Sequence, residues 1–338
     1  MRILHVAHQQ LRKYGQTRVS WAQKLYFGLV KNDYLVRGFS DRDVAAFEAP
    51  LGIRELGARA ANRRLLETAE AFAPELVIVG HCDIIRNETL EQLRALLPGV
   101  VIAGANNDPL FVPENAAKIE HRCAVVDAMF VSTGERELAQ FTGQRARLLH
   151  MPNPVDAAIE SADCSQRSDQ RHDLIFCSKS EEYTERGVTV RYLRDNLEDT
   201  IDFYTPGSFG TPGVWGRDYD EALADSRMGL NLNRQEGLHW YSSARMAQMG
   251  GNGLLVFTHA DAGFDEMFPP ETLAYFSSPE QLLEQVRCFA ADDPLRRHWA
   301  ARTRRFFHDQ VNSRLYARYI VEASLQRPYS HGYVWCRG

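Results

Sequence analysis

The sequence lacks several features that would place the protein in other structural classes. No apolar run approaches the roughly 20 residues that a membrane-spanning helix needs. The six cysteines, at positions 82, 123, 164, 177, 288 and 336, form no C-x-x-C pair, which argues against a zinc or disulfide framework and favours reduced, buried thiols. Residues 1–7 are too short and polar for a secretory signal and instead predict a first strand, so secretion is not expected.

Strong charge of one sign is also missing. The 338 residues carry a formal net charge of −5, with 19 Lys and Arg against 17 Asp and Glu (+2) in residues 1–150 and −7 in the remainder. Nucleic-acid binding proteins usually concentrate positive charge in one domain, so nucleic acid is not expected as a partner. No G-x-G-x-x-G follows the first predicted strand. Asp41-Arg-Asp43 has the letters of a metal-binding D-x-D, but it follows a predicted strand and does not require a metal.

The sequence does contain a regular alternation of strand-like and helix-like segments. Strands are predicted near residues 3–7, 34–39, 76–79, 100–103 and 128–131, with helices at 17–31, 59–72, 87–96, 114–125 and 135–141. The proline-containing segment His150–Asp156 indicates a linker. The pattern then restarts, with strands near 174–177, 201–204, 228–232, 254–257 and 273–276, and helices at 188–196, 219–225, 243–249, 279–289, 294–307 and 313–323. This alternation predicts an α/β protein with two Rossmann-like, doubly wound domains, residues 1–155 and 156–310, followed by a terminal helix and tail, 311–338.

The most informative segment is Gly229–Phe257, which predicts a strand, a polar and aromatic loop, a helix, a glycine-rich turn and a buried strand. Ser242 or Ser243 is a candidate cap for the helix, which carries Arg245 and Gln248. A helix that begins at the carboxyl end of a parallel strand favours anions, because its free N–H groups and its dipole point outward. The segment therefore predicts an anion site.

The same segment resembles the donor-binding region of GT-B glycosyltransferases, especially the CgeB-like and family 4 (group 1) members. Their Arg, two residues, Glu, then Gly pattern falls on Arg245, Gln248 and Gly253, with Gln in place of the Glu that holds the donor ribose. In a second register, Glu236-Gly237 resembles the opening of the family 4 E-x7-E motif, whose closing Glu then falls on Ala244. The resemblance implies ribose contact by Gln248 or Glu236.

Further roles on the donor side follow from the resemblance. It implies that Lys179 or Arg186 contacts the diphosphate, that His239 faces the transferred sugar, and that Gly251 belongs to the donor site. It also implies that the loop 208–215 holds the nucleotide base, where Trp215 or Phe209 either stacks on the base or packs in the core.

On the acceptor side, the resemblance implies that the loop after the first strand borders the interdomain cleft, with His8, Tyr14 and Gly15 near the acceptor. His81, in Gly80-His81-Cys82-Asp83 after the third strand, is a candidate general base or hydrogen-bond donor, with Asp83 as an equivalent candidate. Asp108, after the fourth strand, is a candidate base if the enzyme inverts the donor configuration.

The function implied is a metal-independent glycosyltransferase without a cofactor, which moves a sugar from a nucleotide-sugar to the hydroxyl of a glycan, a lipid-linked or another acceptor. The implied setting is bacterial surface polysaccharide, lipopolysaccharide or glycoconjugate synthesis. Two alternatives stay open: a non-catalytic GT-B scaffold, which the Gln at 248 would suit, and a sugar-nucleotide epimerase or hydrolase.

The location expected is cytoplasmic, with peripheral contact at the inner face of the membrane. Membrane contact would use a basic and aromatic surface on and before the first helix, made of Arg12, Lys13, Arg18, Trp21, Lys24, Phe27 and Lys31. In GT-B folds the terminal helix also packs back onto the first domain.

Overall fold

The computed structural model describes residues 1–13, 20–179 and 183–336. The chain divides into two compact units. Unit 1 is Met1–Pro152 with Ser313–Gly338, and unit 2 is Asn153–Asn312. The chain therefore leaves unit 1 within the proline-containing linker and returns to it at the start of the last helix.

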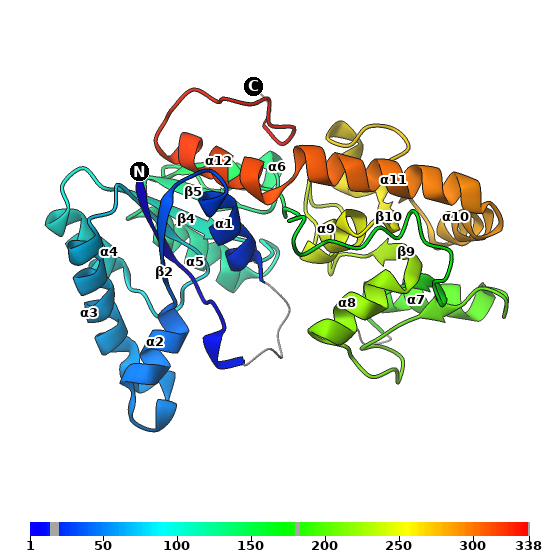
Figure 1. Ribbon diagram of the computed structural model, residues 1–338, viewed down its shortest axis with the longest axis horizontal. Coiled ribbons are helices and arrows are strands. Elements are labelled where there is room, and N and C mark those ends of the chain that lie inside the picture. The colour runs from blue at the N-terminus through cyan, green and yellow to red at the C-terminus, as the bar shows by residue number, and fades with distance from the viewer. Residues whose placement is uncertain (14–19, 180–182, 337–338) are drawn as a thin grey trace. The chain divides into compact units, whose positions relative to one another are not determined.

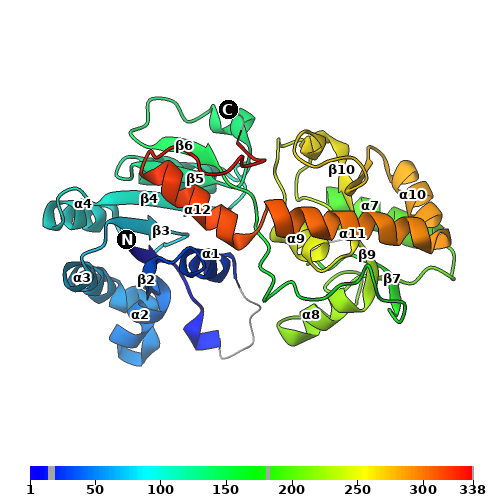
Figure 2. The same cartoon turned by 45° about the horizontal axis from the view of Figure 1, so that its top comes forward.

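Unit 1 is built on a parallel sheet with the strand order β2-β1-β3-β4-β5-β6 among its described residues. Its strands are β1 (Arg2–Val6), β2 (Leu35–Phe39), β3 (Leu76–Val79), β4 (Val101–Asn106), β5 (Ala128–Val131) and β6 (Arg147–His150). Its helices are η1 (Leu11–Lys13), α1 (Trp21–Val30), α2 (Asp41–Glu48), η2 (Pro50–Gly52), α3 (Arg54–Phe72), α4 (Asn87–Leu96), α5 (Pro113–Cys123), α6 (Glu135–Leu138) and α12 (Ser313–Ser324). Helices cover both faces of the sheet (Figures 1 and 2).

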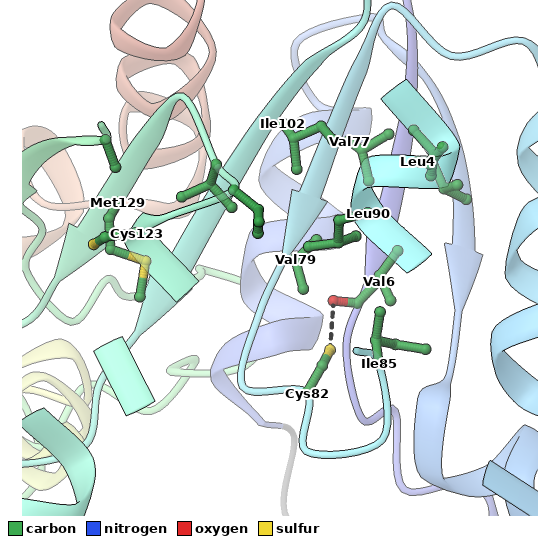
Figure 3. Packing of buried hydrophobic residues seen from close by; sticks show 14 of the residues in the cluster. Leu4, Val6, Val77, Val79, Cys82, Ile85, Leu90, Ile102, Cys123 and Met129 are labelled. Atoms are coloured by element: carbon green, nitrogen blue, oxygen red, sulfur yellow. Dashed lines mark hydrogen bonds between the residues drawn. The ribbon is translucent and has the colours of Figure 1, made fainter. Parts of the chain in front are cut away.

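The core of unit 1 lies where the central strands meet the helices. Leu4, Val6, Val77 and Val79 are fully or almost fully buried, and Figure 3 shows them packed with residues of α4 and the loop before it. The thiol of Cys82 donates a hydrogen bond to the carbonyl of Val6 at 3.1 Å. This contact joins the loop after β3 to β1, and so fixes where that loop begins.

Unit 2 repeats the architecture with the strand order β11-β10-β9-β7-β8, again with parallel pairing in the described part of the chain. Its strands are β7 (His172–Ile175), β8 (Phe203–Tyr204), β9 (Ser226–Asn231), β10 (Leu255–His259) and β11 (Leu273–Phe276). Its helices are α7 (Glu185–Asn196), α8 (Arg217–Ala224), α9 (Ala244–Gly251), η3 (Ala260–Ala262), η4 (Phe264–Glu266), α10 (Pro279–Ala291) and α11 (Asp293–Gln310). Parallel pairing brings the ends of β9, β10 and β11 to one edge, and ligands of such sheets bind at that edge.

The last helix, α12, packs in unit 1 against α1. A Cβ placed on Gly28 of α1 would lie only 2.0 Å from the carbonyl oxygen of Ser313, so this close approach requires glycine. The hydroxyl of Tyr319 donates to the carbonyl of His150 at 3.0 Å, and Trp21 contacts the ring of Tyr316 edge to face. The segment that follows unit 2 in the sequence is thus part of the unit 1 core.

One α-helix and one strand of unit 1 are not predicted by the sequence pattern. The segment Asp41–Glu48 forms α2, although its polar start suggests a loop. Tertiary packing stabilises it, because α2 contacts α3 so closely that a Cβ on Gly57 would lie 1.8 Å from the carbonyl oxygen of Ala45. The short strand β6 is also not predicted. Its four residues are too few to form a strand alone, and pairing with β5 stabilises them.

Candidate functional site

The carboxyl edge of the unit 2 sheet contains a cavity of about 190 Å³. The cavity lies among the start of α7, the loop after β9 and the ends of β10 and β11. Its lining includes Glu185, Arg186, Thr189, Leu232, Asn233, Glu236, His259, Phe276, Ser278 and Pro279. Two residues predicted for the donor site, Arg186 and Glu236, therefore meet in one cavity although 50 positions separate them in the sequence.

Arg245 lies on the first turn of α9, and three of its N–H groups are bonded within the unit. Nη1 donates to the carbonyl of Cys177 (3.1 Å), Nη2 to the carbonyl of Leu232 (2.9 Å) and Nε to Ser243 Oγ (3.1 Å). Burial lowers the pKa of Arg245. The guanidinium group thus joins the ends of two neighbouring strands and places a positive charge at the start of α9.

Two further arginines lie near enough to influence one another electrostatically. Burial lowers the pKa of Arg186 to about 10, with repulsion from Arg245 and Arg234 as the next causes. Like charges gathered in a half-buried place raise the free energy of the ligand-free protein, and a bound anion relieves that cost. Arg234 was not among the predicted site residues. Its position two residues before Glu236 was the signal available in the sequence.

Glu236 is held by the loop in which it lies. Its carboxylate accepts hydrogen bonds from the backbone N–H of Asn233 (2.7 Å) and from Asn233 Nδ2 (3.0 Å). Burial raises the pKa of Glu236. An acceptor of this kind, fixed at the rim of a small cavity, suits the hydroxyl groups of a ribose or a sugar.

His239, predicted to face the transferred sugar, is largely enclosed by neighbouring loops of unit 2. Its side chain is only 3% exposed, its ring stacks on Trp240, and its Nε2 lies 3.0 Å from Glu266 Oε2. Trp240 is equally buried and donates from its indole N–H to the carbonyl of Gly263 at 3.0 Å. These contacts join the loop after β9 to the loop after β10, and they give His239 a structural role here.

The other predicted donor residues are spread along unit 2. Lys179 is exposed, and its carbonyl accepts a hydrogen bond from Arg186 Nη2 at 2.8 Å. Gln248 is half-buried on α9, and its Oε1 accepts from the hydroxyl of Tyr219 at 2.8 Å. Gly251 is the last residue of α9, at the opposite end from Arg245 and the predicted anion site. A Cβ there would lie 2.7 Å from Val155 and 2.9 Å from Glu160, so close packing explains this glycine.

The loop predicted to hold the nucleotide base separates its two aromatic candidates. Phe209 packs against the unit 2 core and lies under Arg194, whose Cζ is 5.2 Å from the ring centroid. Trp215 is 72% exposed. Phe209 therefore packs in the core, which was one of the two predicted alternatives. Trp215 has an exposed face on which a base can stack.

In unit 1, the structure brings His81 and Asp108 together at the carboxyl edge of the sheet. His81 follows β3, Asp108 follows β4, and His81 Nδ1 lies 2.7 Å from Asp108 Oδ2. A carboxylate only accepts, so Nδ1 carries the proton and Nε2 is the ring atom left to exchange one. The hydrogen bond to Asp108 raises the pKa of His81, against the opposing effect of burial.

Asp83 extends this cluster and lines a cavity together with His81. Its carboxylate lies 3.5 Å from His81 Nε2 and 2.5 Å from Arg42 Nη2. Burial, the largest single effect, opposes its ionisation, but the positive charges of His81, Arg42, Lys118 and Arg54 together lower the pKa of Asp83. The neighbouring cavity has a volume of about 600 Å³, and its lining includes His81, Asp83, Asn106 and Lys118. It is large enough for a sugar-sized molecule.

The remaining acceptor-side residues and the D-x-D letters lie before this cluster in the sequence. His8 is half-buried, with Nε2 at 3.8 Å from Asp43, and Tyr14 and Gly15 lie outside the described residues. Asp43 accepts hydrogen bonds from Ser40 Oγ and the backbone N–H of Leu11, and so belongs to a structural network. Within the described ranges, no group of three or more His, Cys, Asp or Glu is arranged to hold a metal ion.

The basic and aromatic surface predicted on α1 is not present as a continuous surface. Lys24 is buried, with 4% exposure, and Trp21 packs against Tyr316 of α12. Arg18 lies outside the described residues. The prediction was wrong for Lys24, which is buried. The helix α12, which is distant in the sequence, packs on α1 at Gly28 and Trp21 (Figure 2). Among the described helices, none is both long enough and apolar enough to cross a membrane.

Comparison with known proteins identifies a family to which part of the chain is similar. Residues 186–322 match the family model described as glycosyl transferase-like. No curated protein sequence matches the chain.

Solved structures share the whole architecture at low sequence identity. HepE of Anabaena in complex with UDP-glucose is 10% identical and has a TM-score of 0.61, with 96% of this chain and 100% of that chain covered. Sucrose-phosphate synthase from Thermosynechococcus elongatus is 10% identical, with a TM-score of 0.63 and coverage of 96% and 99%. The trehalose-6-phosphate synthase OtsA is 11% identical, with a TM-score of 0.63 and coverage of 97% and 100%.

These similarities define the class: the protein has the GT-B fold, with two Rossmann-like α/β units. More narrowly, the segment similar to the glycosyl transferase-like family, residues 186–322, contains Arg186, Arg234, Glu236 and Arg245. The predicted fold class and the resemblance to GT-B glycosyltransferases are confirmed. The CgeB-like subtype stays a prediction.

Proposed function

We propose that this protein is a glycosyltransferase that takes a sugar from a nucleotide-sugar bound by unit 2 and transfers it to an acceptor hydroxyl bound by unit 1. The observation that carries the proposal is the cavity at the carboxyl edge of the unit 2 sheet, lined by Arg186 and Glu236. Arg245 and Arg234 add positive charge that helps to lower the pKa of Arg186. Such positive charge suits a diphosphate and stabilises it as a leaving group without a metal or a cofactor. A nucleotide-sugar is also bound by HepE, which has a similar fold.

For the acceptor, the proposed base is His81, acting through Nε2. Asp108 would orient the ring through Nδ1 and stabilise the imidazolium that forms when His81 takes the hydroxyl proton. The proton would thus move from the acceptor oxygen to Nε2 as the oxygen bonds to the anomeric carbon of the sugar and the nucleoside diphosphate leaves. The cavity beside His81 supports this assignment, because it provides space for an acceptor next to the base.

The setting we propose is bacterial synthesis of surface polysaccharide, lipopolysaccharide or another glycoconjugate, at the cytoplasmic side of the membrane. It rests on the family resemblance alone, because fold does not specify the acceptor. The donor nucleotide and its sugar are the first facts to measure.

The test is a thermal-shift panel with UDP, GDP, CMP, dTDP and ADP and their sugars, with and without a chelator. A nucleotide that binds the folded state raises the melting temperature by mass action. We expect one nucleotide to raise the melting temperature of the wild type, and to raise that of Arg234→Gln less, because the variant lacks one positive charge. Arg234 is exposed, so its replacement should leave the fold intact. No shift with any nucleotide would overturn the proposal. Nucleotide binding without sugar transfer would favour the non-catalytic scaffold. Release of free sugar would favour a hydrolase, and an epimerised sugar-nucleotide would favour an epimerase.

A further inference from the structure

Unit 1 exposes a group of large apolar side chains at the turn between α2 and α3. The exposed fractions are 64% for Phe47, 95% for Leu51, 45% for Ile53 and 64% for Leu56. These four residues, here named the apolar tip, lie within ten consecutive positions. Single exposed apolar residues are ordinary, but a contiguous group of this kind marks an interaction surface.

The backbone of the apolar tip keeps Leu51 in solvent at a cost. Leu51 has φ 58°, in the left-handed region that non-glycine residues rarely adopt. The adjoining turn is anchored by Arg12, whose Nη1 donates to the carbonyl of Gly52 at 3.2 Å. Strained backbone of this kind is often found where function requires it. The backbone conformation of the turn therefore holds the side chain of Leu51 in solvent.

The charges around the apolar tip favour a negatively charged partner. Glu48 is ion-paired with Arg64, and Glu55 with Arg54, each at 2.8 Å. Arg12 and Arg59 are exposed, and in the part of the chain that the structure describes neither pairs with a carboxylate. The positive charge left around the apolar side chains comes from these arginines, whereas the nearby carboxylates are already neutralised.

The position of the apolar tip suits a flat partner. The helix α2 and the turn after it lie at an extremity of unit 1 in both views (Figures 1 and 2). Apolar side chains on a projecting turn, flanked by arginines, match the interface of an anionic bilayer, where the side chains enter the acyl boundary and the arginines contact lipid phosphates.

We propose that the apolar tip docks unit 1 on an anionic membrane surface, with Phe47 and Leu51 inserted at the headgroup level and Arg12 and Arg59 on lipid phosphates. This surface replaces the one predicted on α1, where Lys24 is buried. The proposal is independent of sugar transfer, since no residue of the apolar tip lines the cavity beside His81.

The experiment is vesicle flotation of the full chain with neutral phosphatidylcholine vesicles and with vesicles that also contain phosphatidylglycerol. We expect binding to the anionic vesicles only, and weaker binding as salt rises. The variant Phe47→Gln/Leu51→Asn should lower the partition coefficient by about tenfold or more. Asn tolerates the left-handed φ of position 51, so this variant is expected to fold. The matched control is Val188→Gln, which changes an exposed apolar residue of unit 2.

Three outcomes would overturn the proposal. The first is that the wild type does not bind anionic vesicles. The second is that the double variant binds them as strongly as Val188→Gln does. The third outcome is concentration-dependent dimers of the wild type without lipid that the double variant abolishes, since this would assign the apolar tip to contact between two copies of the chain. Nucleotide thermal shifts, measured on the same samples, report the donor site separately.

Discussion

The guanidinium group of Arg245 lies over the ring of Phe176, with its Cζ 5.3 Å from the ring centroid. The ring and two strand-end carbonyls hold the guanidinium in one place, so little side-chain entropy remains to be lost when an anion binds. Arg186 and Arg234 reach the same region from other segments. Unit 2 thus combines one fixed cation with two cations from α7 and the loop after β9.

Replacement of Arg186 by Gln should weaken binding of the nucleotide diphosphate by about 10- to 100-fold, because one charge-assisted hydrogen bond is lost. Titration calorimetry with the nucleotide found in the panel measures this change. Arg217→Gln is the control, since Arg217 is an exposed arginine of unit 2 that is paired with Glu221. Equal affinities of the two variants would remove Arg186 from the donor site.

The variant Gln248→Glu tests which residue holds the ribose. The hydroxyl of Tyr219 can donate to a carboxylate as it does to the amide oxygen, so the side chain should keep its place. If Gln248 contacts the ribose, the ionised group should tighten nucleotide binding by about tenfold. An unchanged affinity, together with a large loss in Glu236→Gln, would assign the ribose to Glu236.

The pH dependence of transfer distinguishes the roles of His81 and Asp108. A base must be neutral to accept a proton, and the pKa of His81 is raised from 6.5, so kcat/KM should rise with pH through a value above 6.5. In Asp108→Asn the carboxylate is lost, so this limb should move to lower pH while kcat falls by about 100-fold or more. Loss of activity together with loss of the limb would instead make Asp108 the base, and an unmoved limb would show that the limb does not report His81.

Acid stability should depend on His5, a fully buried residue of β1. Burial lowers the pKa of His5 from 6.5 to about 4, and neither ring nitrogen has a hydrogen-bond partner among the described residues. As pH falls below 6.5 the unfolded chain takes up this proton before the folded protein does. The free energy of unfolding should therefore fall by ~3 kcal/mol between about pH 7 and pH 4 from this group alone.

The variant His5→Leu should remove that part of the acid sensitivity. Urea unfolding at several pH values measures it, with His298→Leu as the control, because His298 is an exposed histidine of unit 2. Parallel losses of stability in the wild type and in His5→Leu would show that other groups cause the acid sensitivity.

The sequence by itself determined the two α/β units and the position of Arg245 at the start of a helix that follows a strand. Alternating strand and helix patterns predict parallel sheets, because a buried parallel strand needs a continuous apolar run and its connection needs a helix. A strand, a loop and a helix that bears Arg245 follow one another in the sequence, so the pattern alone places Arg245 near the end of a strand. His81 and Asp108 each follow a predicted strand, and parallel order brings such positions to one edge.

Only the tertiary structure decided how distant segments change the environment of a side chain. Periodicity cannot show that Lys24 is buried or that Glu266 and Trp240 contact His239. It also cannot show that Arg245 and Arg234 influence the pKa of Arg186. It likewise cannot show that α2 packs on α3 and leaves Leu51 in solvent. These outcomes depend on contacts across long sequence separations, whereas local pattern reports only which face of an element is apolar.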